Sequence, residues 1–319
     1  MAPSVSYWDC GEFIAVSYTL GVPHPPGSPL FLLLGRIASM MPISEDIAFR
    51  VNLLSPLVSA FAVLFLYFII VQLVSHWRGK INSNTDALIA FGAGIVGSLT
   101  FAFTDSHWFN AVEAEVYAFS TFFTAIVVWL ALLWSEKADE QGNERYILII
   151  SYMIGLATGL HLLNLLTIPF VALLIYFRKF KFEWTSFGIL VALTGLVFFI
   201  IHNVIIKGMP KIAASIGVFL TTVLIAFIFA CMVWAILNQR KIASLCLTSV
   251  VLVLIGYSTY ALIFIRSNQD PGIDENDPET VEAFISYLER EQYGDVGLLP
   301  RRFKGIPPIH EVVGFPEGP

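Results

Sequence analysis

Long apolar runs without charged residues constrain this chain more than any other feature. A helix needs roughly 17–25 mostly apolar residues to cross the hydrocarbon of a bilayer. Only 13% of the 319 residues are charged, whereas soluble domains carry about 25%. Backbone amides in lipid must bond within their own segment, so the runs predict helices and an all-α polytopic membrane protein. The candidate spans are 51–75, 87–104, 116–135, 146–177, 184–206, 212–237 and 242–265.

The run 146–177 is long enough for either one tilted helix or a hairpin of two short helices that turns near Gly159–Thr167. Basic residues decide between them, because Lys and Arg gather on the cytoplasmic side of membrane proteins. A hairpin places all the basic loops on one side, and we therefore expect about eight transmembrane helices. These loops contain Arg78 and Lys80, residues 136–145, Arg178, Lys179 and Lys181, and Arg240 and Lys241.

This topology puts the unusual polar segments on the opposite, extracytoplasmic face. Residues 1–45 form an outer loop in which 9–20 and 28–41 are expected to be surface helices joined by a Pro-Gly turn. Residues 46–265 form the bundle. Residues 266–319 form an acidic extracytoplasmic tail, which either docks on the bundle or begins a truncated soluble region. We also expect the loops around 105–115 and 202–211 on this face.

Several kinds of chemistry are poorly supported. The three cysteines have neither metal-ligand nor disulfide-framework spacing. There is no phosphate-binding glycine loop, no zinc-protease motif, no nucleophile elbow and no basic stripe for nucleic acid. The start, residues 1–11, lacks the basic and apolar regions of a signal peptide. We expect no metal centre, cofactor or nucleic-acid partner, and the need for a divalent cation stays open.

Asp9 and Glu12 are the first candidates for chemistry. Their spacing of three puts both carboxylates on one helix face near the apolar boundary, where partial desolvation suits a general base. The alternative is that they only favour a helix N-terminus. His24 lies in a rigid His-Pro-Pro-Gly-Ser-Pro segment, which also fits a plain turn before a helix.

Other polar residues border or interrupt the spans. Arg50 could bind a lipid phosphate or extend to the head groups. Glu115, close to Glu113, lies beside an apolar run, and it is the costlier of the two acids to place there. His161 and Asn164 interrupt a charge-free run, and such residues face the bundle interior for function or for helix–helix hydrogen bonds.

Together these motifs resemble glycosyltransferase family 117, the protein O-mannosyltransferase-like membrane proteins of the GT-C class. The resemblance covers nearly the whole chain, and its first two motifs are specific when taken together. The motifs are residues 6–15, 20–31, 49–54, 114–117, 159–164 and 291–295.

The resemblance implies a GT-C-like helical bundle that transfers a sugar, mannose or another hexose, from a polyprenyl or dolichyl phosphate to Ser or Thr of an acceptor protein. It implies Asp9 as the base and Glu12 as a residue that orients hydroxyl groups, and the two roles could be exchanged. Arg50 and His161 would bind the lipid phosphate. Residues expected to bind acceptor or sugar are His24, Glu115, Tyr117 and Asn164.

The resemblance also implies an integral protein of the bacterial inner membrane or the endoplasmic reticulum, with its active site on the extracytoplasmic face. Relatives carry a transmembrane helix before the Trp-Asp-x-Gly-Glu segment and a larger region after residue 295, so the chain is expected to be truncated at both ends. Two alternatives stay open. A transporter or flippase predicts its key acids at mid-span, and a non-catalytic envelope-complex subunit predicts a surface for a partner.

Overall fold

The computed structural model describes residues 4–6, 8–79 and 81–294. Within these residues all regular elements are helices, and a single β-bridge joins Val22 to Asp274. Seven helical segments of this described part are long and apolar enough to cross a membrane. The predicted all-α polytopic membrane protein is confirmed. The seven segments are Ile47–Arg78, Asn84–Ala102, Val116–Glu136, Leu162–Lys179, Trp184–Ile206, Gly208–Leu237 and Lys241–Ser267.

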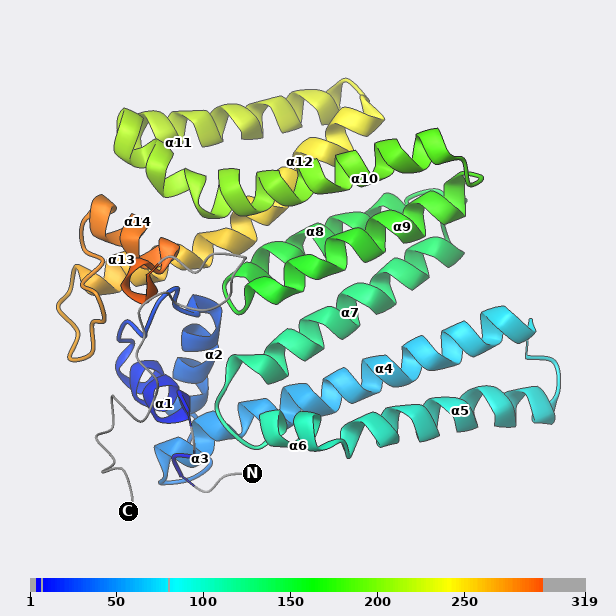
Figure 1. Cartoon of the computed structure of the whole chain (residues 1–319), viewed down its shortest axis with the longest axis horizontal. Helices are drawn as coiled ribbons and strands as arrows, with labels where there is room; N and C mark the ends of the chain where they lie inside the picture. Colours follow the sequence, from blue (N-terminus) through cyan, green and yellow to red (C-terminus); the bar gives the residue numbers. More distant parts are fainter. Residues whose placement is uncertain (1–3, 7, 80, 295–319) are drawn as a thin grey trace, which may run out of the picture.

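The long helices run side by side, and the short ones gather at one end, which we call the α1–α2 end (Figure 1). The first helices are α1 Cys10–Thr19, α2 Pro29–Met40, α3 Ile47–Asn52, α4 Leu54–Arg78, α5 Asn84–Ala102, α6 Asp105–Ala111 and α7 Val116–Glu136. The others are α8 Glu144–Thr158, η1 Leu162–Leu166, α9 Thr167–Lys179, α10 Trp184–Phe199, η2 Ile200–Ile206, α11 Gly208–Leu237, α12 Lys241–Tyr257, η3 Ser258–Tyr260, α13 Ala261–Ser267, α14 Val281–Glu289 and η4 Glu291–Tyr293.

The run 146–177 is a hairpin, as predicted. Helix α8 ends at Thr158, and the chain turns at Gly159–His161 and η1 before it enters α9. With 15 residues, α8 spans about 22 Å at 1.5 Å per residue, which is less than the roughly 30 Å of a hydrocarbon core. The eighth predicted span is therefore present as a helix, but it is shorter than the other seven.

Residues 202–211 are not a loop, contrary to the prediction. The isoleucine-rich segment Ile200–Ile206 continues α10 as a π-helix, in which the Lys207 amide bonds to the His202 carbonyl over 3.2 Å. Helix α11 starts at Gly208, and Pro210 falls in its first turn, where a missing N–H costs nothing. The polarity of His202 and Lys207 suggested a loop, but helical hydrogen bonding of the apolar run prevails.

Helices α1 and α2, which were predicted as surface helices, pack on the bundle. Pro29 at the first position of α2 matches the helix φ angle. The Ser28 hydroxyl donates to the Leu160 carbonyl over 3.1 Å, and the Leu30 amide donates to Gly159 over 3.0 Å. The turn before α2 is therefore fastened to the turn of the α8–α9 hairpin.

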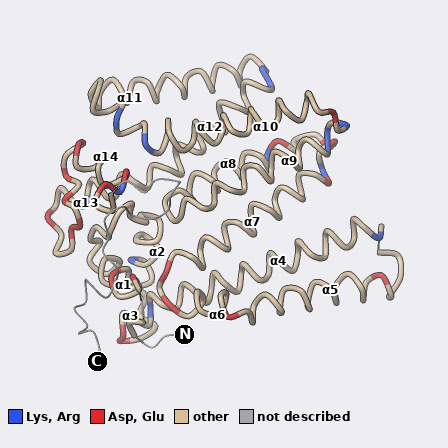
Figure 2. The backbone as a smooth tube through the Cα atoms, viewed as in Figure 1, with Lys and Arg blue, Asp and Glu red and all other residues tan. Residues whose placement is uncertain are grey.

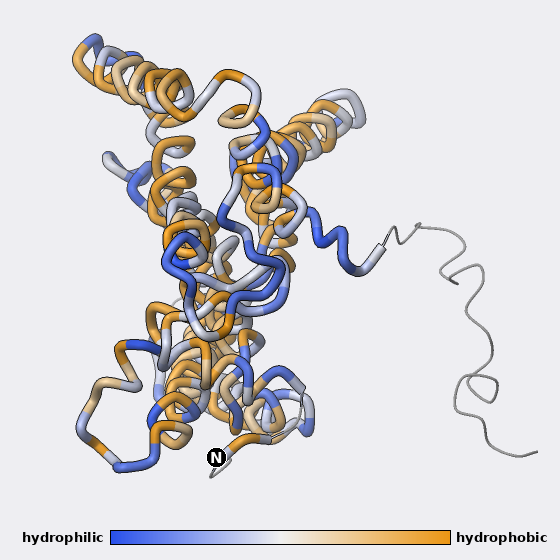
Figure 3. The backbone as a smooth tube through the Cα atoms, turned by 90° about the vertical axis from the view of Figure 1, so that its left-hand side faces the viewer, coloured by the Kyte–Doolittle hydropathy of each residue, from blue (hydrophilic) through white to orange (hydrophobic). Residues whose placement is uncertain are grey.

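The described part of the tail, residues 266–294, docks on the same end of the bundle, and residues 295–319 lie outside the described residues. Tyr287 of α14 is fully buried and donates to the Pro23 carbonyl over 2.6 Å. Lys211 of α11 forms an ion pair with Glu289 over 2.5 Å. Gly27 has a φ of 72°, and a Cβ there would lie 2.7 Å from the Tyr287 hydroxyl. Glycine therefore permits both the turn and the approach of α14, and hydrophilic residues gather in the loops of this end (Figure 3).

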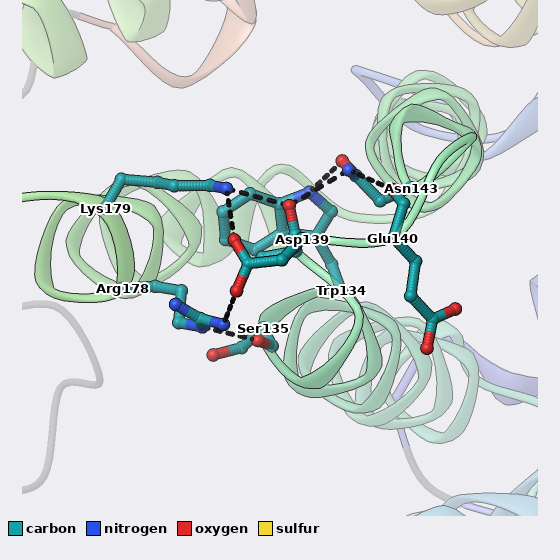
Figure 4. A network of polar contacts seen from close by, with 8 residues as sticks. Trp134, Ser135, Asp139, Glu140, Asn143, Arg178 and Lys179 are labelled. Atoms are coloured by element: carbon teal, nitrogen blue, oxygen red, sulfur yellow. Dashed lines mark hydrogen bonds and ion pairs between the residues drawn. The ribbon is translucent and has the colours of Figure 1, made fainter.

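The opposite end carries basic residues and a polar network (Figures 2 and 4). Asp139 after α7 pairs with Arg178 and with Lys179, the latter over 3.2 Å. Asn143 accepts a hydrogen bond from Trp134 over 3.2 Å and donates to the Ala138 carbonyl over 3.0 Å. The network brings residues 136–145 and the basic end of α9 together, as the hairpin prediction required.

Helices α8 and α12 approach most closely at two glycines. A Cβ on Gly256 would lie 2.4 Å from backbone atoms of Gly155 and Leu156. Small residues allow such backbone contact between membrane helices. The contact brings the α8–α9 turn beside η3, where the Tyr260 hydroxyl donates to the Thr158 carbonyl over 3.2 Å.

We expect Gly256→Ala to destabilise the protein by about 1–3 kcal/mol, because the added methyl group forces the two backbones apart. Gly195→Ala in α10 is the matched control, since a Cβ there has no neighbour within 4 Å and alanine favours helix by up to about 1 kcal/mol. Thermal unfolding in detergent measures both variants. Equal melting temperatures for the two would contradict the proposed role of this contact.

Candidate functional site

The predicted residues Asp9, Glu12 and His24 lie together at the start of α1. The Nδ1 atom of His24 donates to Glu12 Oε2 over 2.8 Å, and its backbone amide donates to Glu12 Oε1 over 2.6 Å. The Nε2 atom is 3.7 Å from Asp9 Oδ2. The His-Pro-Pro segment therefore holds the imidazole between the two carboxylates, on the face that their spacing of three residues predicted.

Electrostatics favours the charged forms of Glu12 and His24. Burial alone would raise the pKa of Glu12, but the two hydrogen bonds from His24 and its charge outweigh burial and lower this pKa overall. The hydrogen bond to Glu12 raises the pKa of His24 against the opposing effect of burial, and the charges of Glu12, Asp9 and Glu275 add to the rise. The two side chains form a half-buried ion pair beside Asp9.

Asp9 and His24 border a cavity of about 480 Å³. Asp9, Phe13 and the segment 24–28 form one wall, and Glu115–Tyr117 at the start of α7 form another. The α8–α9 turn supplies Leu160–Leu163, which include His161. Thr158 at the end of α8 also lines the cavity, and three further polar residues come from later in the chain, namely His202, Tyr260 and Arg290.

Glu115 has an environment different from that of Glu12. It is only 4% exposed, and its Oε2 accepts from the Val116 amide over 2.8 Å. Burial raises its pKa to about 7 against the opposing effect of the hydrogen bond from the Val116 amide. The charges of Asp9 and Glu113 add to the rise, and the charge of His24 opposes it slightly. Near neutral pH Glu12 is therefore ionised, whereas Glu115 is a carboxyl group that can exchange a proton.

His161 and Asn164 separate in the structure. His161 lines the cavity with its ring centroid 5.4 Å from that of Tyr117, and burial followed by the charge of Arg290 lowers its pKa. Asn164 is buried, donates to Ser120 over 3.1 Å and accepts from Thr124 over the same distance. Asn164 therefore joins η1 to α7, which was the structural alternative for this residue, and it is absent from the described lining.

Arg50 also lies outside the cavity lining. Its guanidinium donates to the Ser44 carbonyl over 2.5 Å and to the Ser39 carbonyl over 2.7 Å, at the end of α2. The nearby Asn52 has a more direct effect on the site. It accepts from the Ala114 amide over 2.9 Å and from the Cys10 thiol over 3.5 Å, and so links the residues next to Glu115 and Asp9.

Arg290 and His202 are cavity residues that sequence reasoning missed. Arg290 follows α14 with a left-handed φ of 63°, and its guanidinium lies 4.9 Å from the centre of the Tyr293 ring. The sequence offered no signal for it, because an arginine in a polar tail is usually solvated. His202 did carry a signal, since an ionisable residue in an apolar run commonly faces the protein interior.

A divalent cation is compatible with one part of the site. Asp9, Glu12 and His24 each offer a ligand atom, and these atoms lie within 4.8 Å of one another. Carboxylate oxygens and an imidazole nitrogen suit several divalent metals. The same three groups also satisfy one another through the hydrogen bonds of the ion pair, so the structure explains their grouping without an ion.

The raised pKa of Glu115 predicts that the stability of the folded protein depends on pH. Its folded-state pKa of about 7 exceeds the ordinary value of 4.5, so the folded state binds more protons between these values and stability falls as pH rises through this window. This pKa shift corresponds to roughly 3 kcal/mol in the free energy of unfolding. We expect Glu115→Gln to be more stable than the unmodified protein at pH 8, and the difference to vanish near pH 4.5.

Melting temperatures across this pH range test the prediction, with the exposed Glu45→Gln as control. If the melting temperature of Glu115→Gln fell with rising pH as steeply as that of the unmodified protein, the stated environment of Glu115 would be wrong.

Comparison with known proteins shows the family of this chain. Residues 9–184 match the model of the Protein O-mannosyl-transferase TMEM260 N-terminal domain, which is more than half of the chain. Protein O-mannosyl-transferase tmem260 of Dictyostelium discoideum is 29% identical over 212 residues, covering 62% of this chain and 23% of that protein. Protein O-mannosyl-transferase TMEM260 of Mus musculus is 27% identical over 186 residues, covering 58% and 24%.

The chain thus spans about a quarter of the length of these relatives. No solved structure shows a significant match. The matched residues include Asp9, Glu12, His24, Glu115 and His161, whereas Arg290 lies beyond them. The chain belongs to the protein O-mannosyl-transferase TMEM260 N-terminal domain family.

Proposed function

We propose that this chain forms the membrane-embedded catalytic part of a GT-C glycosyltransferase of the family 117 type. It transfers mannose or another hexose from a polyprenyl or dolichyl phosphate to a serine or threonine hydroxyl of a protein. The observation that carries the proposal is the position of Asp9, beside the Glu12–His24 ion pair and on the wall of a cavity that also contains Arg290. The names of these two relatives, both protein O-mannosyl-transferases, support the same reaction class.

Asp9 acts as the general base in the proposed reaction. Its carboxylate takes the proton of the acceptor hydroxyl while the hydroxyl oxygen attacks the anomeric carbon of the sugar. The bond from that carbon to the phosphate oxygen breaks, and the lipid phosphate leaves with the electron pair. His24 is held by Glu12, and its imidazole Nε2 lies 3.7 Å from the Asp9 carboxylate.

Arg290 takes the phosphate-binding role that the sequence assigned to Arg50. The cavity lining contains Arg290, whereas Arg50 donates to the carbonyls of Ser39 and Ser44. A guanidinium fits phosphate oxygens through paired hydrogen bonds, and such contacts stabilise charge that develops on the leaving group. His161 stays in the proposal as a second phosphate contact, because it lines the same cavity.

A groove beside the cavity supports a lipid-borne donor. Its volume is about 650 Å³, and its lining, from α11 to α14, is almost entirely apolar and shares Tyr260 with the cavity. Most of α11 is exposed, so the groove opens where a bilayer would surround the bundle. We assign the isoprenoid chain of the donor to this groove and its phosphate to the cavity.

The remaining alternatives fit less well. A transporter predicts its key acids at mid-span, but Asp9, Glu12 and Glu115 all lie outside the seven candidate spans of the described chain. A non-catalytic subunit gives no reason for an ion pair beside Asp9 and a cation in the same cavity. The basic loops at the opposite end support an extracytoplasmic site by the positive-inside rule.

We expect Asp9→Asn to lower the rate of sugar transfer about 10²–10⁴-fold, the range for loss of a general base. The assay incubates the full-length protein with polyprenyl-phosphate mannose and counts glycosylated acceptor peptides by mass spectrometry. Asp105→Asn is the control, because Asp105 is exposed on α6 outside the cavity. Full transfer by Asp9→Asn would exclude Asp9 as the base.

The groove generates a separate prediction. Thr221 lines it, whereas the next residue, Thr222, is exposed and absent from its lining. We expect Thr221→Trp to raise the KM for a long-chain polyprenyl-phosphate donor about tenfold, equivalent to about 1.4 kcal/mol, and to leave the KM for a short-chain donor unchanged. Thr222→Trp should alter neither. An equal effect on both donors would exclude the groove as the site of the chain.

A further inference from the structure

A second, smaller cleft shares a wall with the cavity. Its volume is about 290 Å³, and it lies between the segment before α1 and helix α6. Asp9, Glu115 and Tyr117 line both the cleft and the cavity. The proposed base and the buried carboxyl group of Glu115 therefore stand between two spaces, each of which could hold one substrate.

The two spaces differ in chemistry. The cavity contains three histidines, His24, His161 and His202, together with Arg290. The described lining of the cleft has neither a histidine nor a basic residue. Apart from the shared residues, its side chains are Trp8, Phe109, Asn110 and Glu113. A phosphate therefore fits the cavity, and the cleft suits a ligand without negative charge.

Two aromatic side chains of the cleft are exposed to solvent. Trp8 is 84% exposed and Phe109 is 46% exposed. The Asn110 amide nitrogen donates to the Ser106 carbonyl over 2.8 Å, and its oxygen has no hydrogen-bond partner among the described residues. Exposed rings and an open amide acceptor are groups that bind an extended polypeptide, through side-chain contacts and a backbone N–H.

The acidic wall of the cleft is held in place. Glu113 is buried and accepts a hydrogen bond from Ser6. The Ala114 amide between Glu113 and Glu115 donates to Asn52 over 2.9 Å. This segment therefore presents its carboxyl groups from a fixed backbone, and a nearby acidic residue of a ligand would meet like charge.

We propose that this cleft holds the acceptor polypeptide, with uncharged or basic residues preferred over acidic ones next to the modified hydroxyl. The inference rests on the proposed transfer reaction and specifies where its second substrate lies. The acceptor hydroxyl reaches Asp9 from the side of Phe109 and Asn110, and the sugar phosphate approaches from the side of Arg290. The hydroxyl loses its proton to Asp9 as the new bond to the anomeric carbon forms and the bond to the phosphate breaks.

Phe109→Ala and Trp108→Ala form a matched pair that tests the cleft. Both residues are exposed aromatics on α6, but only Phe109 lines the cleft, whereas Trp108 stacks on Phe103. We expect Phe109→Ala, and likewise Asn110→Ala, to raise the KM for an acceptor peptide about tenfold while the KM for the lipid donor changes less than about twofold. Trp108→Ala should leave both constants unchanged. The unchanged donor KM also shows that the variants are folded.

A peptide panel tests the charge preference in the unmodified full-length protein. Peptides that differ only in whether Lys, Ala or Glu flanks the Ser or Thr should be transferred in that order of kcat/KM, and added salt should narrow the difference. Equal kcat/KM for all three would overturn the proposed preference. Equal acceptor KM values for Phe109→Ala and Trp108→Ala would overturn the cleft itself.

These outcomes are distinct from failure of the proposed function. If the unmodified protein transfers sugar and the cleft variants behave like the Trp108 control, the acceptor binds elsewhere and the transferase proposal stands. If the unmodified protein transfers no sugar to any peptide in the panel, both proposals fail together.

Discussion

The need to bond every backbone amide inside the hydrocarbon determines the layout of this protein. Helices satisfy that need along most of their length, although α11 contains one non-helical residue, Gly217. At one end, the turns before α2 and after α8 bond to each other through Ser28 and Leu30. Tyr287 then joins α14 to the same turn. The cavity exists because several helix ends meet there and satisfy one another's backbone groups.

The carboxyl groups of Glu12 and Glu115 have pKa values shifted in opposite directions because their environments differ. Glu12 receives two hydrogen bonds from His24, and these outweigh its partial burial. Glu115 is more deeply buried and receives one hydrogen bond from its own helix, so desolvation dominates. This difference separates an ion pair, which can position a charge, from a group that can change its charge near pH 7.

The sequence predicted local features of the fold and site well. Apolar runs predicted the helices, because hydropathy depends on neighbouring residues, and the placement of basic residues predicted the α8–α9 hairpin. The grouping of Asp9, Glu12 and His24 followed from a three-residue spacing and a rigid turn. The π-helix at Ile200–Ile206 was not predicted, since His202 and Lys207 looked like loop residues although hydrogen bonding along the apolar run keeps them helical.

Long-range placement could not be predicted in the same way. Arg50 looked suited to a phosphate, but its guanidinium bonds to carbonyls at the end of α2, a contact that depends on how α2 and α3 pack. Arg290 reaches the cavity only because α14 folds back on the first turn of the chain, more than two hundred residues away in sequence. The absence of a side chain at Gly27 leaves the space that the Tyr287 hydroxyl occupies.

This dependence on α14 links the electrostatics of the cavity to the tail of the chain. The turn at Pro23–Gly27 carries His24, so the Tyr287 contact with Pro23 holds α14 directly beside the residue that faces Asp9. Arg290 lies three residues after Tyr287, and its side chain lines the cavity. One packing contact therefore helps to place both the imidazole beside Asp9 and the guanidinium in the lining of the cavity. The combination of acidic and basic groups in this cavity follows from tertiary packing, and no single motif contains it.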